Sequence, residues 1–143
     1  MATAELKGLD RFKALLAYLP EAIKADMKAA LDKESNDLVE ALKRACPVAP
    51  EFEAHPGQLR DSIHAYDNPH RPMSRFIVAD AKDEKGHKFA SHVEFGHIDA
   101  RYGKQVPPSP FFFPIYRARR AAMKRRLSAA YRRAVDNYLK GKI

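Results

Sequence analysis

Six histidines are the side chains of this sequence best suited to metal chemistry, and they lie at positions 55, 64, 70, 87, 92 and 97. His87, His92 and His97 follow one another at intervals of five residues. On a helix, that spacing turns successive side chains about 140° apart and off a common face. The sequence contains no His-Glu-x-x-His pattern. The spacing therefore favours histidines of turns and surfaces over a metal site.

Two serine and histidine pairs could in principle activate a nucleophile. Ser62 and His64 would share one face of a strand, and a second serine, Ser91, directly precedes a histidine. Neither pair lies in a recognisable nucleophile turn, and the sequence has no glycine-rich phosphate loop. The one cysteine, Cys46, excludes an intrachain disulfide, and we expect it to be a small buried residue near a helix end. We therefore expect no catalytic residues, no cofactor and no metal, in a protein that is not an enzyme.

Glu94 is an acidic residue between two apolar ones, Val93 and Phe95. Its carboxylate is expected to be partly buried, and it would then need a cation or hydrogen-bond donors around it. The favoured partner is an arginine of the basic C-terminal segment, which gives Glu94 a structural role rather than an acid–base role.

The elements that must position these residues begin with two helical stretches. Apolar residues at helical spacing predict a helix over residues 10–19, which Pro20 interrupts. A second helix is expected from Glu21 to just before Pro47, because a residue that precedes proline is pushed out of helical conformation. The apolar residues of this second helix follow at intervals of four, four, seven and four, and they are Ile23, Met27, Leu31, Leu38 and Leu42.

The middle of the chain is expected to form short strands and helices joined by loops. Residues 47–57 are rich in proline and form a loop. The alternation over residues 58–66 fits a strand, with room for one helical turn before it, and residues 75–79 form a second β-rich run. Residues 83–86 are typical of a turn. Residues 88–95 fit either a strand or a helical turn, because their apolar residues satisfy neither period, and a short helix that ends at Gly96 is favoured.

The C-terminal part is organised by residues 107–114, which read Pro-Pro-Ser-Pro-Phe-Phe-Phe-Pro. Proline favours extended backbone in the residue before it, and Pro114 suits the first turn of a helix. We expect an extended arm that anchors its aromatic residues and leads into a long helix over residues 114–140, ended by Gly141. Taken together, the elements predict an α+β fold. It would be a single domain, residues 1–143, with long N-terminal and C-terminal helices packed on a small, mainly antiparallel sheet.

The net charge of +8 is unevenly spread. From Arg101 onward there are 12 lysines and arginines and one acidic residue, whereas the first hundred residues hold 14 basic and 17 acidic ones. Such an imbalance indicates a polyanion or an acidic protein surface nearby. No apolar run approaches the roughly 20 residues that span a bilayer, and the first residues lack the apolar core of a signal peptide. We therefore expect no membrane contact, and synthesis in a cytoplasm.

The basic C-terminal helix has two interpretations. Its lysines and arginines could contact nucleic-acid phosphates, with tyrosines nearby, or could form a stripe that faces solvent or a protein partner. No helix-turn-helix, zinc-finger or RNA-binding signature is present, so base-specific recognition is not expected. The candidates for a DNA channel or an acidic partner are Arg117, Arg120, Lys124, Arg125 and Arg132.

Three short sequence motifs follow one another along the chain. A helix ends in Ala-Cys-Pro-Val at residues 45–48 and is followed by Gly-Gln-Leu-Arg-Asp-Ser-Ile at residues 57–63. Val-Glu-Phe-Gly comes at residues 93–96, and Pro-Phe-Phe-Phe-Pro at residues 110–114 leads into the last helix. From about Asp37 onward the chain thus resembles the tail-completion, or head-to-tail joining, proteins of long-tailed bacteriophages, often described as minor tail components. It departs from them in the longer link over residues 47–57 and in His97, where a threonine commonly follows the glycine.

The resemblance implies a structural protein of the virion neck, in a phage, a prophage or a gene-transfer particle. It would assemble in the host cytoplasm as a ring, a hexamer, between the head-closure (stopper) protein and the tail tube with its terminator. DNA would pass through this ring without sequence readout. The interface candidates are Phe111, Phe112, Phe113, Tyr116, Glu94 and Phe95. Packing of the phenylalanines into the chain's own core is the competing expectation, and a small basic DNA-binding protein is the alternative function.

Overall fold

A computed structural model describes residues 19–48 and 55–141 of the chain. In chain order its elements are α2 (Glu21–Ala45), α3 (Gln58–Asp61), β1 (Ile63–Asp67), β2 (Arg75–Ala79), α4 (Ala90–Phe95), β3 (His97–Asp99), β4 (Lys104–Val106) and α5 (Phe112–Leu139). The helix expected over residues 10–19 falls, apart from its last residue, outside the described part of the chain. The predicted α+β class is confirmed.

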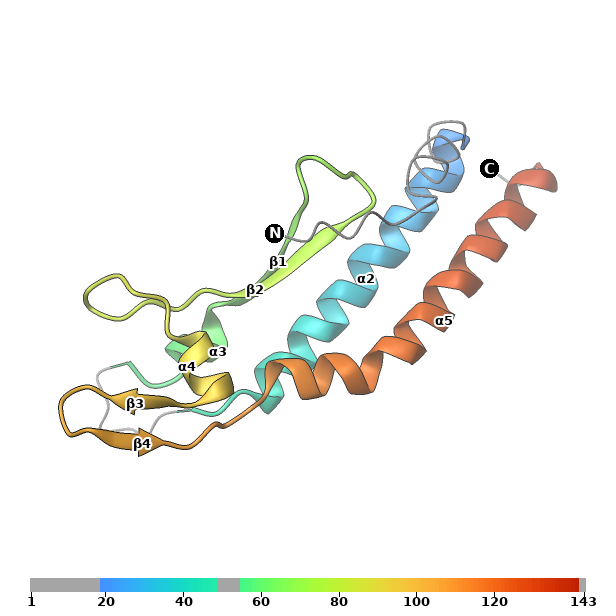
Figure 1. The fold of residues 1–143 in the computed structure, drawn as a ribbon. Coiled ribbons are helices and arrows are strands. Elements are labelled where there is room, and N and C mark those ends of the chain that lie inside the picture. The colour runs from blue at the N-terminus through green and yellow to red at the C-terminus, as the bar shows by residue number, and fades with distance from the viewer. Residues whose placement is uncertain (1–18, 49–54, 142–143) are drawn as a thin grey trace, which may run out of the picture.

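Two long helices dominate the molecule. Helix α2 begins directly after Pro20 and ends at Ala45, with Cys46 as its C-cap just before Pro47, as predicted. Helix α5 runs back alongside α2 (Figure 1) and ends near the residue expected to stop it, Gly141, whose φ of 65° is left-handed. No helix among the described residues is long and apolar enough to cross a bilayer.

A β-hairpin lies on the other side of α2 from α5 (Figure 1). Strands β1 and β2 pair in antiparallel fashion, with Ala65 opposite Ile77 and Tyr66 opposite Phe76. Because side chains alternate across a strand, the first pair packs on the core and the second is exposed. The single helical turn before β1 is also present, as α3.

The hydrophobic core is small and lies where the C-terminal half of α2 meets α3, β1 and the start of α5. Leu42 and Ile63 are the largest side chains that are completely buried among the described residues. The remaining buried members of this cluster are Leu38, Val39, Cys46, Leu59, Ala81 and Phe111. Burial raises the pKa of the Cys46 thiol to about 11, so this cysteine is a packing residue, as expected.

A second hairpin, β3 and β4, was not predicted. No element was predicted for residues 97–106, but His97 pairs with Val106 and Asp99 with Lys104. Both strands have only three residues and no buried face, so no apolar alternation marks them in the sequence. The described residues thus contain two separate two-stranded sheets rather than one small sheet.

Gly96 allows this second hairpin to lie against the chain that follows it. Its φ of 75° is left-handed, and it ends α4 as predicted. A Cβ atom added at Gly96 would lie 2.7 Å from the Val106 carbonyl oxygen and 2.9 Å from the Pro108 nitrogen. Only glycine therefore fits here without displacing backbone.

Candidate interaction surface

The carboxylate of Glu94 caps the N-terminus of α5. Its Oε2 accepts hydrogen bonds from the backbone N–H groups of Phe111 (2.8 Å) and Phe112 (3.0 Å), and its Oε1 accepts one from Phe113 (3.0 Å). Helix α5 has no capping side chain of its own, and Pro114 has no N–H to satisfy. A residue of α4 therefore supplies the cap that the start of α5 lacks, and its negative charge suits the helix dipole.

This cap changes the expected partner of Glu94 and the expected start of α5. The prediction that Glu94 pairs with an arginine is wrong, because its direct partners are backbone N–H groups and Arg117 adds only longer-range attraction. Burial by itself would raise the pKa of Glu94, but the three N–H donors and Arg117 outweigh it and hold that pKa below the usual range. Because the cap satisfies the first turn, α5 begins at Phe112 rather than at Pro114.

The proline-rich arm is also tied to α4 through its backbone. The N–H of Ser109 donates to the carbonyl oxygen of Val93 at 2.8 Å. Together with the three bonds to Glu94, this contact joins the arm to α4 on both sides of Pro110. The Val-Glu-Phe-Gly and Pro-Phe-Phe-Phe-Pro motifs are therefore two halves of one structural unit.

The three phenylalanines of the arm have different surroundings. Phe111 is buried, with 2% of its surface exposed, and Phe112 packs against the same core. Phe113 is 41% exposed and its ring lies 5.9 Å from that of Phe95, which is 67% exposed. The guanidinium carbon of Arg117 lies 5.9 Å from the centre of the Phe113 ring. Two phenylalanines thus hold the arm in place, and the third forms an exposed aromatic pair with Phe95.

An ion pair between a buried carboxylate of α2 and a half-exposed arginine of α5 fixes how the two helices lie along each other. The carboxylate of Glu34 is almost fully buried and accepts from Arg126 Nε at 2.7 Å and from its Nη2 at 2.9 Å. This two-bond geometry specifies both position and orientation. The hydrogen bond to Glu34 also raises the pKa of Arg126. This pair was not predicted, although Glu34 lies in the seven-residue gap between Leu31 and Leu38 of the apolar stripe of α2.

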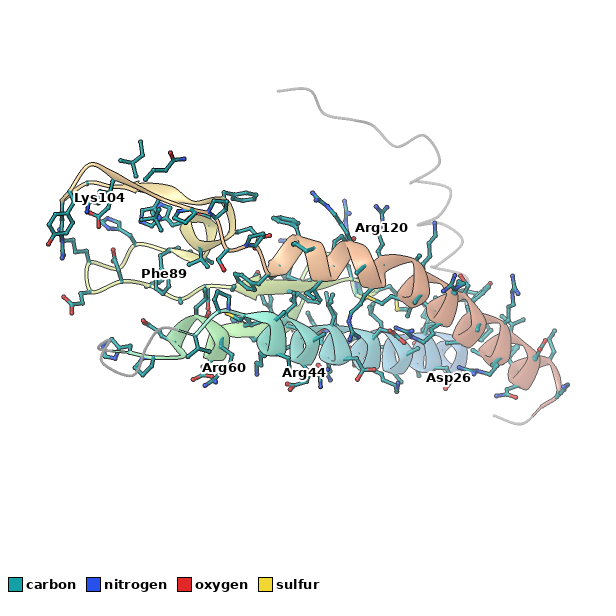
Figure 2. The ribbon with its side chains drawn as sticks, turned by 90° about the horizontal axis from the view of Figure 1, so that it is seen from below. Asp26, Arg44, Arg60, Phe89, Lys104 and Arg120 are labelled. Carbon is teal, nitrogen blue, oxygen red and sulfur yellow. The ribbon has the colours of Figure 1, made fainter. Side chains whose placement is uncertain are left out.

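An open groove of about 690 Å³ lies along the helix pair. Its apolar lining comes from Met27 of α2 and from the α5 residues Tyr116, Met123, Leu127 and Tyr131. Three basic side chains also line it, namely Arg120, Lys124 and Arg132. We call this surface the α5 groove. Figure 2 shows Arg120 projecting from α5 on the side away from α2.

The comparisons with known proteins place the chain in a family. A family model described as "Bacteriophage HK97-gp10, putative tail-component" matches residues 10–96, which is more than half of the chain. The chain belongs to the HK97-gp10-like family. This confirms the resemblance to phage tail-joining proteins at the level of the family and makes the protein a phage tail component. No curated protein and no solved structure matches the chain.

The family match of this HK97-gp10-like chain ends at Gly96. It therefore includes α2, the β1 and β2 hairpin, and α4 with Glu94, but neither the second hairpin nor α5. The α5 groove and the exposed Phe113 belong almost entirely to the part beyond the match.

The proposed DNA or acidic-partner residues all lie on α5. Arg120, Lys124 and Arg132 line the α5 groove, Arg117 lies over Phe113, and Arg125 is exposed outside the groove. These five candidates therefore lie in three different environments along α5.

The histidines of the HK97-gp10-like chain include one neighbouring pair that was not predicted. The rings of His92 and His97 stack with centres 5.0 Å apart, because α4 ends between them at Gly96 and the chain turns back. Over the described ranges, no group of three His, Cys, Asp or Glu side chains is placed to hold a metal ion. The Nδ1 of His64 lies 2.8 Å from the Ser62 carbonyl oxygen, so this ring contacts the serine's backbone rather than its hydroxyl.

Proposed function

We propose that this phage tail component is a structural subunit of the neck, which assembles as a ring around the DNA channel and joins the head-closure protein to the tail tube. One observation supports this most strongly. Helix α5 has 28 residues, and among them only Ala134 is fully buried. A helix of that length in a complete globular domain would bury a whole stripe of side chains. Part of the surface of α5 therefore remains open to contacts beyond those with α2.

The exposed residues at the base of α5 suit a contact between subunits. A ring needs two different surfaces on each subunit that fit one another. Phe95, Phe113 and Tyr116 are exposed near the start of α5 and offer one such surface. Phe111, Phe112 and Glu94 contribute to it by holding the arm in place. In this proposal the ring is a hexamer, and its neighbours are the stopper protein, the tail terminator and the tail-tube protein.

The charge of α5 suits a position near passing DNA. The helix carries eight lysines and arginines and a single acidic residue, Asp136. Such a surface attracts phosphates without reading bases. The finished protein would lie in the neck of the virion, after assembly in the host cytoplasm, with no enzymatic role.

Size exclusion with mass detection tests this proposal, on the protein alone and mixed with the stopper or terminator protein of the same phage. A closed ring, or a monomer that forms one with a partner, is the expected result. A protein that stays monomeric with both partners would contradict the proposal.

A small DNA-binding protein without sequence preference is the second candidate, which the same eight basic residues favour. It predicts binding to any duplex, with an affinity that falls steeply as the salt concentration rises. Fluorescence anisotropy with two unrelated duplexes measures this directly. Tight binding by a persistent monomer would favour this function over the neck subunit.

A further inference from the structure

One side of α5 carries an apolar stripe against which another helix could pack. Phe113, Tyr116, Met123, Leu127 and Tyr131 recur at helical spacing along it, and Met123 and Leu127 are half-buried while the others are exposed. At the helical rise, the distance from Phe113 to Tyr131 is about 27 Å, which is five turns. An apolar stripe of this length is typical of helix-in-groove recognition.

The charge beside this stripe restricts what can occupy it. Arg120, Lys124 and Arg132 line the α5 groove next to its apolar residues. None of the three forms an ion pair with another residue in the described ranges. Arg126, in contrast, is already neutralised by Glu34. An occupant with carboxylates beside its apolar residues would complement all three free bases.

A second copy of the chain offers no such face among its described residues. Two α5 grooves facing each other would oppose three bases to three bases. Helix α2 has acidic residues on its surface, but Glu21, Asp37 and Glu40 each pair with a lysine of the same helix, and the exposed Asp26 is a single carboxylate. Helix α2 also has no large apolar residue among those that are exposed. These properties favour a different protein over a second copy.

We propose that the α5 groove binds an amphipathic helix of another protein, with an apolar stripe flanked by aspartate or glutamate. The inference rests on the proposed function in one respect, which is that the partner is a neighbouring virion protein. The test needs no ring. A failure to bind the helix and a failure to form a ring are therefore separate results.

The test uses the full chain and a synthetic helical peptide of about 20 residues, labelled for fluorescence anisotropy. The peptide has leucine at positions i, i+4, i+7 and i+11, and glutamates lie on both sides of this leucine stripe. A second peptide has glutamine in place of every glutamate. The matched protein variants are Arg120→Glu, inside the groove, and Arg125→Glu, an exposed arginine of the same helix outside it.

The expected result is binding of the glutamate peptide and about tenfold weaker binding after Arg120→Glu, since reversing one charge turns an attraction into a repulsion. The Arg125→Glu variant should change the affinity less than about twofold, and the glutamine peptide should bind more weakly. A benzophenone in place of one leucine should crosslink to residues between Met123 and Tyr131. Binding that is equally weakened by both variants, or absent, would overturn the proposal.

Two further outcomes would assign the groove to another occupant. Competition by a peptide of residues 8–19 of this chain would assign it to the chain's own N-terminal segment. Competition by duplex DNA, with loss of DNA binding in Arg120→Glu but not in Arg125→Glu, would assign it to DNA. Either result overturns the proposed protein partner.

Discussion

At the scale of the residue, Glu94 has the most consequential position in the chain. One carboxylate satisfies three backbone N–H groups at a helix start whose N-cap residue, Phe111, makes no side-chain hydrogen bond. It also connects a residue of the matched family region with the helix beyond it. Neighbouring residues in the sequence could not reveal this contact, because the donors lie 17–19 residues further along the chain.

Replacing Glu94 with glutamine should destabilise the protein by about 1–2 kcal/mol at pH 7, because the cap loses its charge and one of its two acceptor oxygens. Urea unfolding followed by circular dichroism measures this. Glu84→Gln, at an exposed turn, is the matched control and should have almost no effect. Equal stability of wild type and Glu94→Gln would contradict the capping role.

The stabilisation from Glu94 should also depend on pH. Its folded-state pKa lies below the ordinary value of 4.5, so its contribution is complete above that value and is lost as the pH falls through the folded-state pKa. The difference in stability between wild type and Glu94→Gln should therefore shrink as the pH is lowered from 7 to about 3. A difference that stayed constant over this range would show that the charge of Glu94 is not what stabilises the cap.

At the scale of the element, Gly96 and the ion pair between the long helices set how the parts join. Gly96→Ala should destabilise the protein by about 2 kcal/mol or more, since it adds both left-handed strain and a clash with backbone. Gly103→Ala is the matched control, because Gly103 also has a left-handed φ of 62° but open space where the Cβ would lie. Thermal unfolding of both variants measures the two losses of stability, and the difference between them is the cost of the clash with backbone beyond that of the left-handed strain. Equal destabilisation would show that the contact with Val106 costs nothing.

The pairing of Arg126 with Glu34 should be visible in a double-mutant cycle. Arg126→Met should destabilise the protein measurably, because it leaves the buried Glu34 carboxylate without its partner. The double change Glu34→Met with Arg126→Met should recover most of that loss. Arg125→Met, on an exposed neighbour, should be nearly neutral. Losses that simply add in the double variant would show that the two side chains are not coupled.

Elements marked by local patterns could be predicted from the sequence. The two prolines that bound α2, the alternation before and in β1, the β-rich residues of β2, and the glycine that ends α4 all act within a few residues. The β3 and β4 hairpin could not be predicted, since it has no buried face to impose a pattern. The aromatic and basic residues of the candidate surface could be named from the sequence. It could not show which phenylalanine stays exposed, because that depends on the cap supplied by Glu94.

At the scale of the whole molecule, the helix pair and the hairpins form an extended structure rather than a closed one. Lys104 and Asp26 lie near opposite ends of it (Figure 2). The main cluster of buried side chains lies in the middle, where α2, α3, β1 and Phe111 meet, and both ends project beyond it. Large side chains such as Phe95, Ile98 and Tyr102 are exposed at the hairpin end, and Tyr138 and Leu139 at the other. Exposed apolar side chains at both ends are typical of a subunit that packs against neighbours.

The most direct test of the ring assembly is size exclusion with mass detection on three proteins, each with and without its stopper protein. They are the wild type, Phe113→Ser at the base of α5, and Phe76→Ser on the β1 and β2 hairpin, two phenylalanines of nearly equal exposure at 41% and 43%. We expect the wild type to form a closed ring, Phe113→Ser to lose it, and Phe76→Ser to keep it, with all three equally helical by circular dichroism. A wild type that stays monomeric with its partner, or a ring that survives Phe113→Ser but not Phe76→Ser, would contradict the account.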